Sequence, residues 1–247
     1  MIAGGDIELS AGINVNNYNV IQGGGDLTVT SDAGYILNRE TGVIDVDGSV
    51  IANGGTYFQN RAGGLVQAGN DIIATSQNLN VANYGLLSAQ RDVNLTSSAA
   101  NFLNYDSGVI SAGRNVVLDA ANYVSNRAGG VILAGGNLSA TSGAGYISND
   151  VDATIDVGGI VDFNSGSQIY DYGTLNAASI DFDAAGLVRT RREGRYNFEG
   201  TVNAGSYEAE VGRWLGYGDI TTVGSLSITS SADSDICLLY TSPSPRD

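Results

Sequence analysis

The chain has 247 residues, of which 26 are acidic and 11 basic, giving a net charge of −15 and a pI near 4.1. Such an acidic surface argues against nucleic acid and anionic membranes as partners, and no apolar run approaches the ~20 residues that span a bilayer. All basic residues are arginine and histidine does not occur, which excludes acid–base chemistry by histidine.

Residues 1–186 carry a repeat whose most regular member is an asparagine that returns every 21 to 23 residues. An apolar side chain stands two residues before each asparagine, and Asp171 occupies the next place in the series. A fixed period of this length indicates one small structural unit stacked on copies of itself. The asparagines are Asn17, Asn38, Asn60, Asn83, Asn104, Asn126 and Asn149.

Each repeat holds three short runs with a period of two, as at 102–104, 110–112 and 116–118. Period two is the signature of a strand, and the Gly, Asn, Asp and Ser between the runs are turn residues. Strands this short bury their apolar side only if successive coils stack at the ~4.8 Å spacing of paired strands. The sequence therefore predicts an all-β fold, a right-handed parallel β-helix with about 22 residues and three short strands per coil.

The recurring asparagine has the same parity as the inward apolar residue two places before it, so we expect its side chain to point inward. Stacked amides can hydrogen-bond along such a column, as in other stacked sheets. A lone buried amide would cost roughly 1–3 kcal/mol, and an internal asparagine ladder removes that cost everywhere except at its ends.

The repeat falters after Gly186, and we expect residues 187–218 to form an irregular insertion or a junction between repeat blocks. The first part lengthens one coil to 27 residues between Leu175 and Val202. Basic and aromatic residues gather here, which predicts binding of an anionic glycan or a partner protein; the alternatives are a solvated hairpin for the arginines and core packing for the tryptophan. The candidate binding residues are Arg189, Arg191, Arg192, Arg195 and Trp214.

Residues 219–236 return to the regular pattern and are expected to form a further coil. Residues 237–247 hold the only Cys and both Pro, and they resemble read-through into a sequencing-library adapter, so we expect them to be unstructured; a natural disordered C-terminus is the alternative. No capping unit is visible at either end, which predicts that the chain is an internal fragment of a longer protein.

Two further groups are candidates for function. Asp162, Asp181 and Asp183 alternate with inward residues, so they face solvent together, and stacked carboxylates could serve as a weak metal site or as acid and base of a polysaccharide lyase or hydrolase; a solvated acidic stripe is the simpler interpretation. Tyrosines directly follow several ladder positions, although arginines take that place in other coils, which favours packing at the turn over a continuous aromatic strip.

The repeats at 107–120 (SGVISAGRNVVLDA) and 129–142 (GGVILAGGNLSATS) resemble the haemagglutinin repeats of filamentous haemagglutinin-like exoproteins. The join at 126–130 (NRAGG) does so as well, and the resemblance covers about residues 4–185 in one register. It implies a bacterial protein exported by two-partner secretion through a dedicated outer-membrane transporter, located outside the cell or on its surface.

Members of that family act as adhesins or as stalks that carry a C-terminal toxin for contact-dependent inhibition. The resemblance therefore implies a shaft with no enzymatic activity and no cofactor, whose partners are the transporter and a receptor or glycan on a host or neighbouring cell. The competing class is a β-helical polysaccharide lyase or hydrolase that uses the three aspartates.

Overall fold

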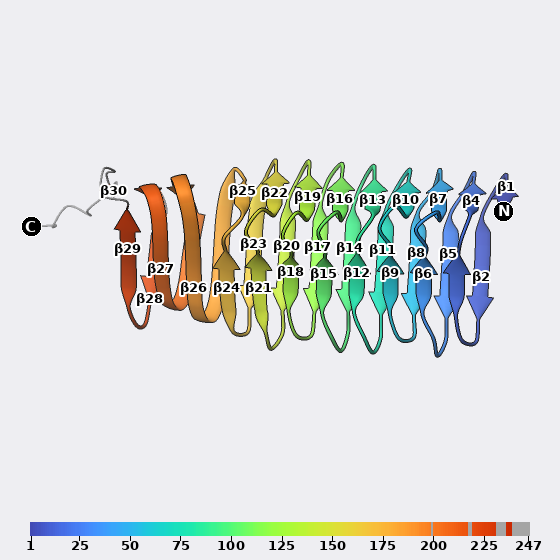
Figure 1. Ribbon diagram of the computed structural model, residues 1–247, viewed down its shortest axis with the longest axis horizontal. Coiled ribbons are helices and arrows are strands. Elements are labelled where there is room, and N and C mark those ends of the chain that lie inside the picture. The colour runs from blue at the N-terminus through green and yellow to red at the C-terminus, as the bar shows by residue number, and fades with distance from the viewer. Residues whose placement is uncertain (199, 217–218, 231–235, 239–247) are drawn as a thin grey trace, which may run out of the picture.

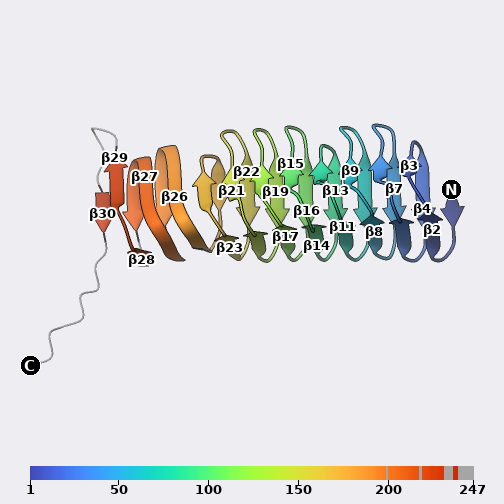
Figure 2. The same ribbon diagram turned by 90° about the horizontal axis from the view of Figure 1, so that it is seen from below.

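The computed structural model describes residues 1–198, 200–216, 219–230 and 236–238. Strands are stacked side by side along one long axis, from β1 at one end to β29 at the other (Figures 1 and 2). All strand pairs are parallel, and equivalent residues of successive coils lie opposite one another. The predicted fold, a right-handed β-solenoid of about nine turns with about 22 residues per turn, is confirmed.

Each coil contributes one strand to each of three columns. The first column, named here the broad sheet, contains β2 (Ile7–Ala11), β5 (Leu27–Ser31), β8 (Val50–Gly54), β11 (Ile72–Ser76), β14 (Val93–Ser97), β17 (Val116–Ala120), β20 (Leu138–Ser142) and β23 (Ile160–Ser165). The second, the ladder sheet, contains β3 (Val15–Asn17), β6 (Ile36–Asn38), β9 (Phe58–Asn60), β12 (Val81–Asn83), β15 (Phe102–Asn104), β18 (Val124–Asn126), β21 (Tyr146–Asn149) and β24 (Gln168–Asp171).

The third column, the nine-stranded sheet, contains β1 (Ile2–Ala3), β4 (Val20–Gly23), β7 (Val43–Val46), β10 (Leu65–Ala68), β13 (Leu86–Ala89), β16 (Val109–Ala112), β19 (Val131–Ala134), β22 (Thr154–Val157) and β25 (Thr174–Asn176). It ends at β25. Five more strands follow: β26 (Ser179–Phe198), β27 (Gly200–Gly216), β28 (Asp219–Thr222), β29 (Leu226–Ser230) and β30 (Ile236–Leu238).

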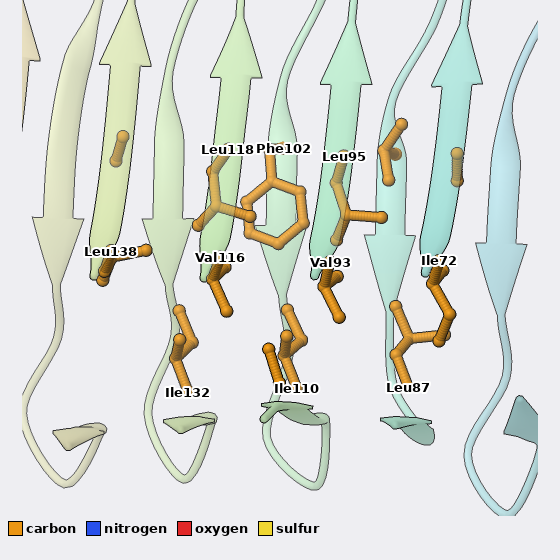
Figure 3. Packing of buried hydrophobic residues seen from close by; sticks show 14 of the residues in the cluster. Ile72, Leu87, Val93, Leu95, Phe102, Ile110, Val116, Leu118, Ile132 and Leu138 are labelled. Atoms are coloured by element: carbon orange, nitrogen blue, oxygen red, sulfur yellow. The ribbon is translucent and has the colours of Figure 1, made fainter. Parts of the chain in front are cut away.

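The inward residues of all three columns form one continuous core. Figure 3 shows large side chains such as Phe102 and Leu95 projecting between coils toward Ile110 and Leu87 of the facing column. Phe102, Ile110 and Val116 have no exposed surface. Burial of each large apolar side chain contributes about 1.5–3 kcal/mol, so the stack of coils supplies what a single coil lacks. No helix long and apolar enough to cross a membrane occurs in the described part of the chain.

The region after β25 differs from the expected long coil. Val202 lies opposite Phe182, 20 residues earlier, and does not share a column with Leu175, so the expected 27-residue coil does not form. Residues 187–198 belong to β26 and pair in parallel with β27, with register shifts between Ala184 and Leu187 and between Arg192 and Arg195. Cys237 and Leu238, which we expected within an unstructured tail, lie in β30.

Candidate functional site

The asparagine ladder runs without a break through the solenoid interior. Each side-chain amide nitrogen donates to the side-chain oxygen of the next asparagine at 2.9–3.0 Å, from Asn17 to Asn149. Asn149 donates to a carboxylate oxygen of Asp171 at 3.0 Å, so a side chain that accepts follows the last amide. Five of the seven asparagines are at most 1% exposed, and Asn17 at the first coil is 8% exposed.

The ladder amides also hold the corner between the ladder sheet and the nine-stranded sheet. Asn83 Nδ2 donates to the backbone carbonyls of Gly85 in its own coil and of Val109 in the next coil. Val109 begins the next strand of the nine-stranded sheet, and the other ladder asparagines make the same contact with the first residue of a strand. The ladder is therefore a structural device that satisfies the backbone where the chain turns.

A second ladder lies at the entrance to the broad sheet, and the sequence analysis missed it. An Asp or Asn just before the first inward residue accepts the backbone N–H of the equivalent residue in the next coil, as Asp92 does from Asn115 at 3.0 Å. The same bond recurs at Asp6, Asp26, Asp71, Asn115 and Asn137. The signal was present in the sequence, because Asp or Asn precedes Ile, Leu or Val at most of these places.

The outer side of the ladder sheet carries all nine tyrosines of the first 178 residues. We name this surface the tyrosine–arginine face. Its turn column follows the ladder residues and contains Tyr18, Arg39, Arg61, Tyr84, Tyr105, Arg127 and Tyr172, and its entry column precedes the inward apolar residues and contains Tyr35, Tyr57, Tyr123 and Tyr146. Between the columns lie the middle residues of the ladder strands.

The rings of this face stack on one another along the rod. The centroids of Tyr84 and Tyr105 are 4.2 Å apart with an angle of 4° between the rings. The guanidinium of Arg127 lies 5.4 Å from the centroid of Tyr105, and that of Arg39 lies 5.0 Å from the centroid of Tyr18. The arginines therefore continue the aromatic column by cation–π contact, which supports the predicted packing role at the turn.

The two columns cover the outward residues between them. Leu37 and Leu103 point away from the core by parity, yet each is only 2% exposed. Leu37 lies between Tyr35 and Arg39 in the sequence, so large side chains flank it on both sides. A sugar or protein that contacts this face meets ring edges and hydroxyls, because the ring faces are occupied by their neighbours.

Two of the predicted basic candidates extend the tyrosine–arginine face. Arg189 lies opposite Tyr170 in the register of β24 and β26, and Arg191, two residues further, is exposed. Arg192 and Arg195 lie in β26, and Trp214 lies in β27 opposite Tyr196, but the side chains of these three residues lie outside what the structure describes.

The acidic candidates lie on the broad sheet, as predicted. Asp162 is opposite Asp181 and Asn164 is opposite Asp183. Partial burial, and then the charges of Asp181 and Asp183, raise the pKa of Asp162 above its ordinary value. Among the described residues no group of three or more His, Cys, Asp or Glu is arranged to hold a metal ion, so the three aspartates are not gathered into such a site.

Comparison with known proteins adds no further constraint on this site. No protein-family model, no curated protein and no solved structure matches this chain.

Proposed function

We propose that this chain is a segment of the β-helical shaft of a large secreted bacterial surface exoprotein. The observation that best supports the proposal is the unbroken stack of in-register coils with one continuous core and one internal ladder. Such a stack is stiff and extended, and it suits a molecule that carries a binding or toxic tip away from the cell, or that adheres along its length. The resemblance of the repeats to filamentous haemagglutinin-like exoproteins points the same way.

The proposed export route agrees with how such a stack folds. Each coil contacts mainly its neighbours along the chain, so folding can proceed coil by coil as the polypeptide emerges from a pore. Residues 1–236 contain no cysteine, so this part of the chain forms no disulfide that would block passage of an unfolded chain. The proposed partners are an outer-membrane two-partner secretion transporter and a receptor or glycan on a host or neighbouring cell.

The test uses the uninterrupted gene and its neighbour. The full-length gene is expressed in a Gram-negative host with and without the adjacent outer-membrane transporter gene, and the protein is measured in the medium and on the cell surface. We expect export only when the transporter is present. Export that does not depend on the transporter, or retention in both strains, would contradict the proposal. Binding to host cells, or growth inhibition of neighbouring cells in co-culture, then separates an adhesin from a toxin stalk.

A second candidate function is a polysaccharide lyase or hydrolase. The register of Asp162 over Asp181 and the raised pKa of Asp162 favour it, because paired carboxylates with separated pKa values are a common source of acid and base. Its test is cleavage of a polyuronate by the intact chain. Cleavage that Asp181→Asn abolishes and Asp119→Asn leaves intact would replace the shaft proposal, since Asp119 faces solvent on the same sheet opposite Thr96 and Thr141.

A further inference from the structure

Three pairs of tyrosines on the tyrosine–arginine face stack in parallel across neighbouring coils. The ring centroids are 4.2 Å apart in the pair Tyr84–Tyr105, 4.7 Å in Tyr35–Tyr57 and 4.9 Å in Tyr123–Tyr146. The angles between the rings are 4°, 11° and 6° in the same order. A chain without cysteine before residue 237 thus brings reactive side chains of adjacent coils together repeatedly.

The first pair has the closest geometry. The hydroxyls of Tyr84 and Tyr105 are hydrogen-bonded, and burial together with this bond raises the pKa of Tyr84 to about 12. Because the rings are parallel and their hydroxyls adjoin, the ring carbons next to the hydroxyls also face each other. These carbons carry much of the unpaired electron in a phenoxyl radical. Both residues are half-buried, so a soluble oxidant can reach the edges of the rings.

We propose that these three stacked pairs are sites of oxidative cross-linking, in which a dityrosine bond joins each coil to the next. The inference rests on the stacking geometry alone and stands whether or not the chain is part of a secreted shaft. The oxidant is a peroxide acting through a haem peroxidase, which removes one electron at a time.

The step balances as follows. Each phenol loses one electron and its hydroxyl proton, and the two phenoxyl radicals couple through the carbons next to their oxygens. One C–C bond forms, two C–H bonds break, and the two protons return to the oxygens. Over the whole reaction two hydrogen atoms leave the pair and reduce one hydrogen peroxide to two water molecules. Rings joined in this way have centroids about as far apart as those of Tyr84 and Tyr105, so coupling needs rotation of the rings and leaves the coils in place.

A dityrosine bond would connect coils that are otherwise held only by non-covalent contacts. It closes a loop of one repeat, which lowers the entropy of the unfolded chain in the way that a disulfide does. The cross-linked coil cannot separate from its neighbour at that corner, so the stack would resist both heat and pulling force.

The test is peptide mapping of the intact chain after treatment with hydrogen peroxide and a haem peroxidase. Trypsin cleaves between the two members of every pair, because Arg39, Arg91 and Arg127 lie between them in the sequence. We expect linked peptides 62–91 with 92–114, 1–39 with 40–61, and 115–127 with 128–189, each two hydrogens lighter than the sum of its parts. The blue fluorescence of dityrosine should appear with them, and the first link should form in the highest yield. The yield should not depend on protein concentration.

Tyr105→Phe is the matched variant, because phenylalanine preserves the stacked ring and removes the phenol. It should abolish the link between 62–91 and 92–114 and preserve the other two. Tyr18→Phe is the control, since Tyr18 has Arg39 over its ring and no tyrosine in the next coil; it should change nothing. Oxidised tyrosine without linked peptides, links that form equally in guanidinium-unfolded chain, or links that grow with protein concentration would each overturn the proposal.

Discussion

The coils that end in an asparagine and the coil that ends in Thr190 differ in one respect that explains the shape of the molecule. After every ladder asparagine, and after Asp171, the chain turns and adds a strand to the nine-stranded sheet. Thr190 takes the next place in the ladder register, and there the chain does not turn: β26 continues straight to Phe198. The nine-stranded sheet and the ladder therefore end together.

This coincidence has a physical reason. At a corner the backbone leaves one sheet before it joins the next, so some of its carbonyls lack strand partners. An inward asparagine supplies donors to carbonyls on both sides of the corner, and its oxygen serves the amide of the previous coil. A threonine side chain is too short to do all three. Thr190 is fully buried and its hydroxyl has no hydrogen-bond partner, so the ladder does not pass through it.

The sharpest way to break the comparison is to place a carboxylate where the ladder needs a donor. In Asn149→Asp, residue 149 can no longer donate to Asp171, and two carboxylates then lie one coil apart in a buried column. We expect a loss of about 4 kcal/mol in the free energy of unfolding at neutral pH, because a buried charge is left without compensation. The measurement is denaturant unfolding followed by circular dichroism.

The same variant should recover stability in acid. One carboxyl of the pair will have a raised pKa in the folded state, so the folded chain binds a proton more tightly than the unfolded chain. Stability is then present at low pH and is lost as the pH rises through the folded pKa. Equal instability of Asn149→Asp at acidic and neutral pH would contradict the proposed role of donor polarity in the ladder.

The second prediction compares the middle of the ladder with its edge. Asn83→Ala removes two amide–amide bonds and the corner bonds to Gly85 and Val109 at a fully buried position, and it should cost about 3 kcal/mol. Asn17→Ala ends the ladder one coil earlier and should cost about 1 kcal/mol. Asn94→Ala, on the outer side of the broad sheet, is the control and should have little effect. Thermal and denaturant midpoints of the three variants give the order.

The periodic part of the fold could be read from the sequence because one side chain per coil repeats without exception. The inward parity of the asparagine followed from its spacing to the apolar residue before it, and the internal ladder is confirmed for each of the seven. The end of the nine-stranded sheet was not foreseen, because Val202 fits the apolar pattern of either column. Only the pairing with Phe182 decides between them.

The tyrosine–arginine face could be predicted only in part. Sequence spacing showed that Arg39, Arg61 and Arg127 share a column with tyrosines, and we took them to interrupt an aromatic strip. A guanidinium is planar and packs over a ring about as well as a second ring does, so the arginine continues the stack. That contact depends on rotamers, which the period of the repeat does not reveal.

A third prediction tests the corner itself. Gly63 and Gly129 follow their ladder asparagines by three residues and have positive φ angles of 83° and 75°. A Cβ on Gly129 would lie 2.4 Å from the backbone oxygen of Asp106 in the preceding coil. Gly129→Ala should therefore lower the free energy of unfolding by about 2 kcal/mol, from backbone strain and the close contact.

Gly12→Ala is the control for this variant, because a Cβ there meets no atom within 4 Å and reduces the freedom of the unfolded chain. It should be neutral or slightly stabilising. Differential scanning calorimetry of the two variants provides the comparison. If both variants melt at the same temperature, the close approach of coils at Gly129 does not constrain the corner.

The smallest predicted effect concerns the coils beside the end of the ladder, where Asp162 lies opposite Asp181. Burial and the neighbouring charges raise the pKa of Asp162, so its protonated form is favoured in the folded state and the ionised form opposes folding. The stabilising contribution of the proton is present below the ordinary carboxyl pKa and is lost as the pH rises through the raised value. Asp162→Asn should therefore stabilise the chain at neutral pH by about 0.5 kcal/mol, as expected for relief of like charges across a strand pair.

The advantage of Asp162→Asn should vanish at about pH 3, where the parent carboxyl is protonated in both states, and it should shrink at high salt, which screens exposed charges. Asp119→Asn on the same sheet has threonines in both neighbouring coils and should show no such dependence. Denaturant midpoints at the two pH values decide the matter. If Asp162→Asn instead destabilises the chain at neutral pH, the paired carboxylates are held by a favourable interaction, which would strengthen the case for a cation or a substrate at this face.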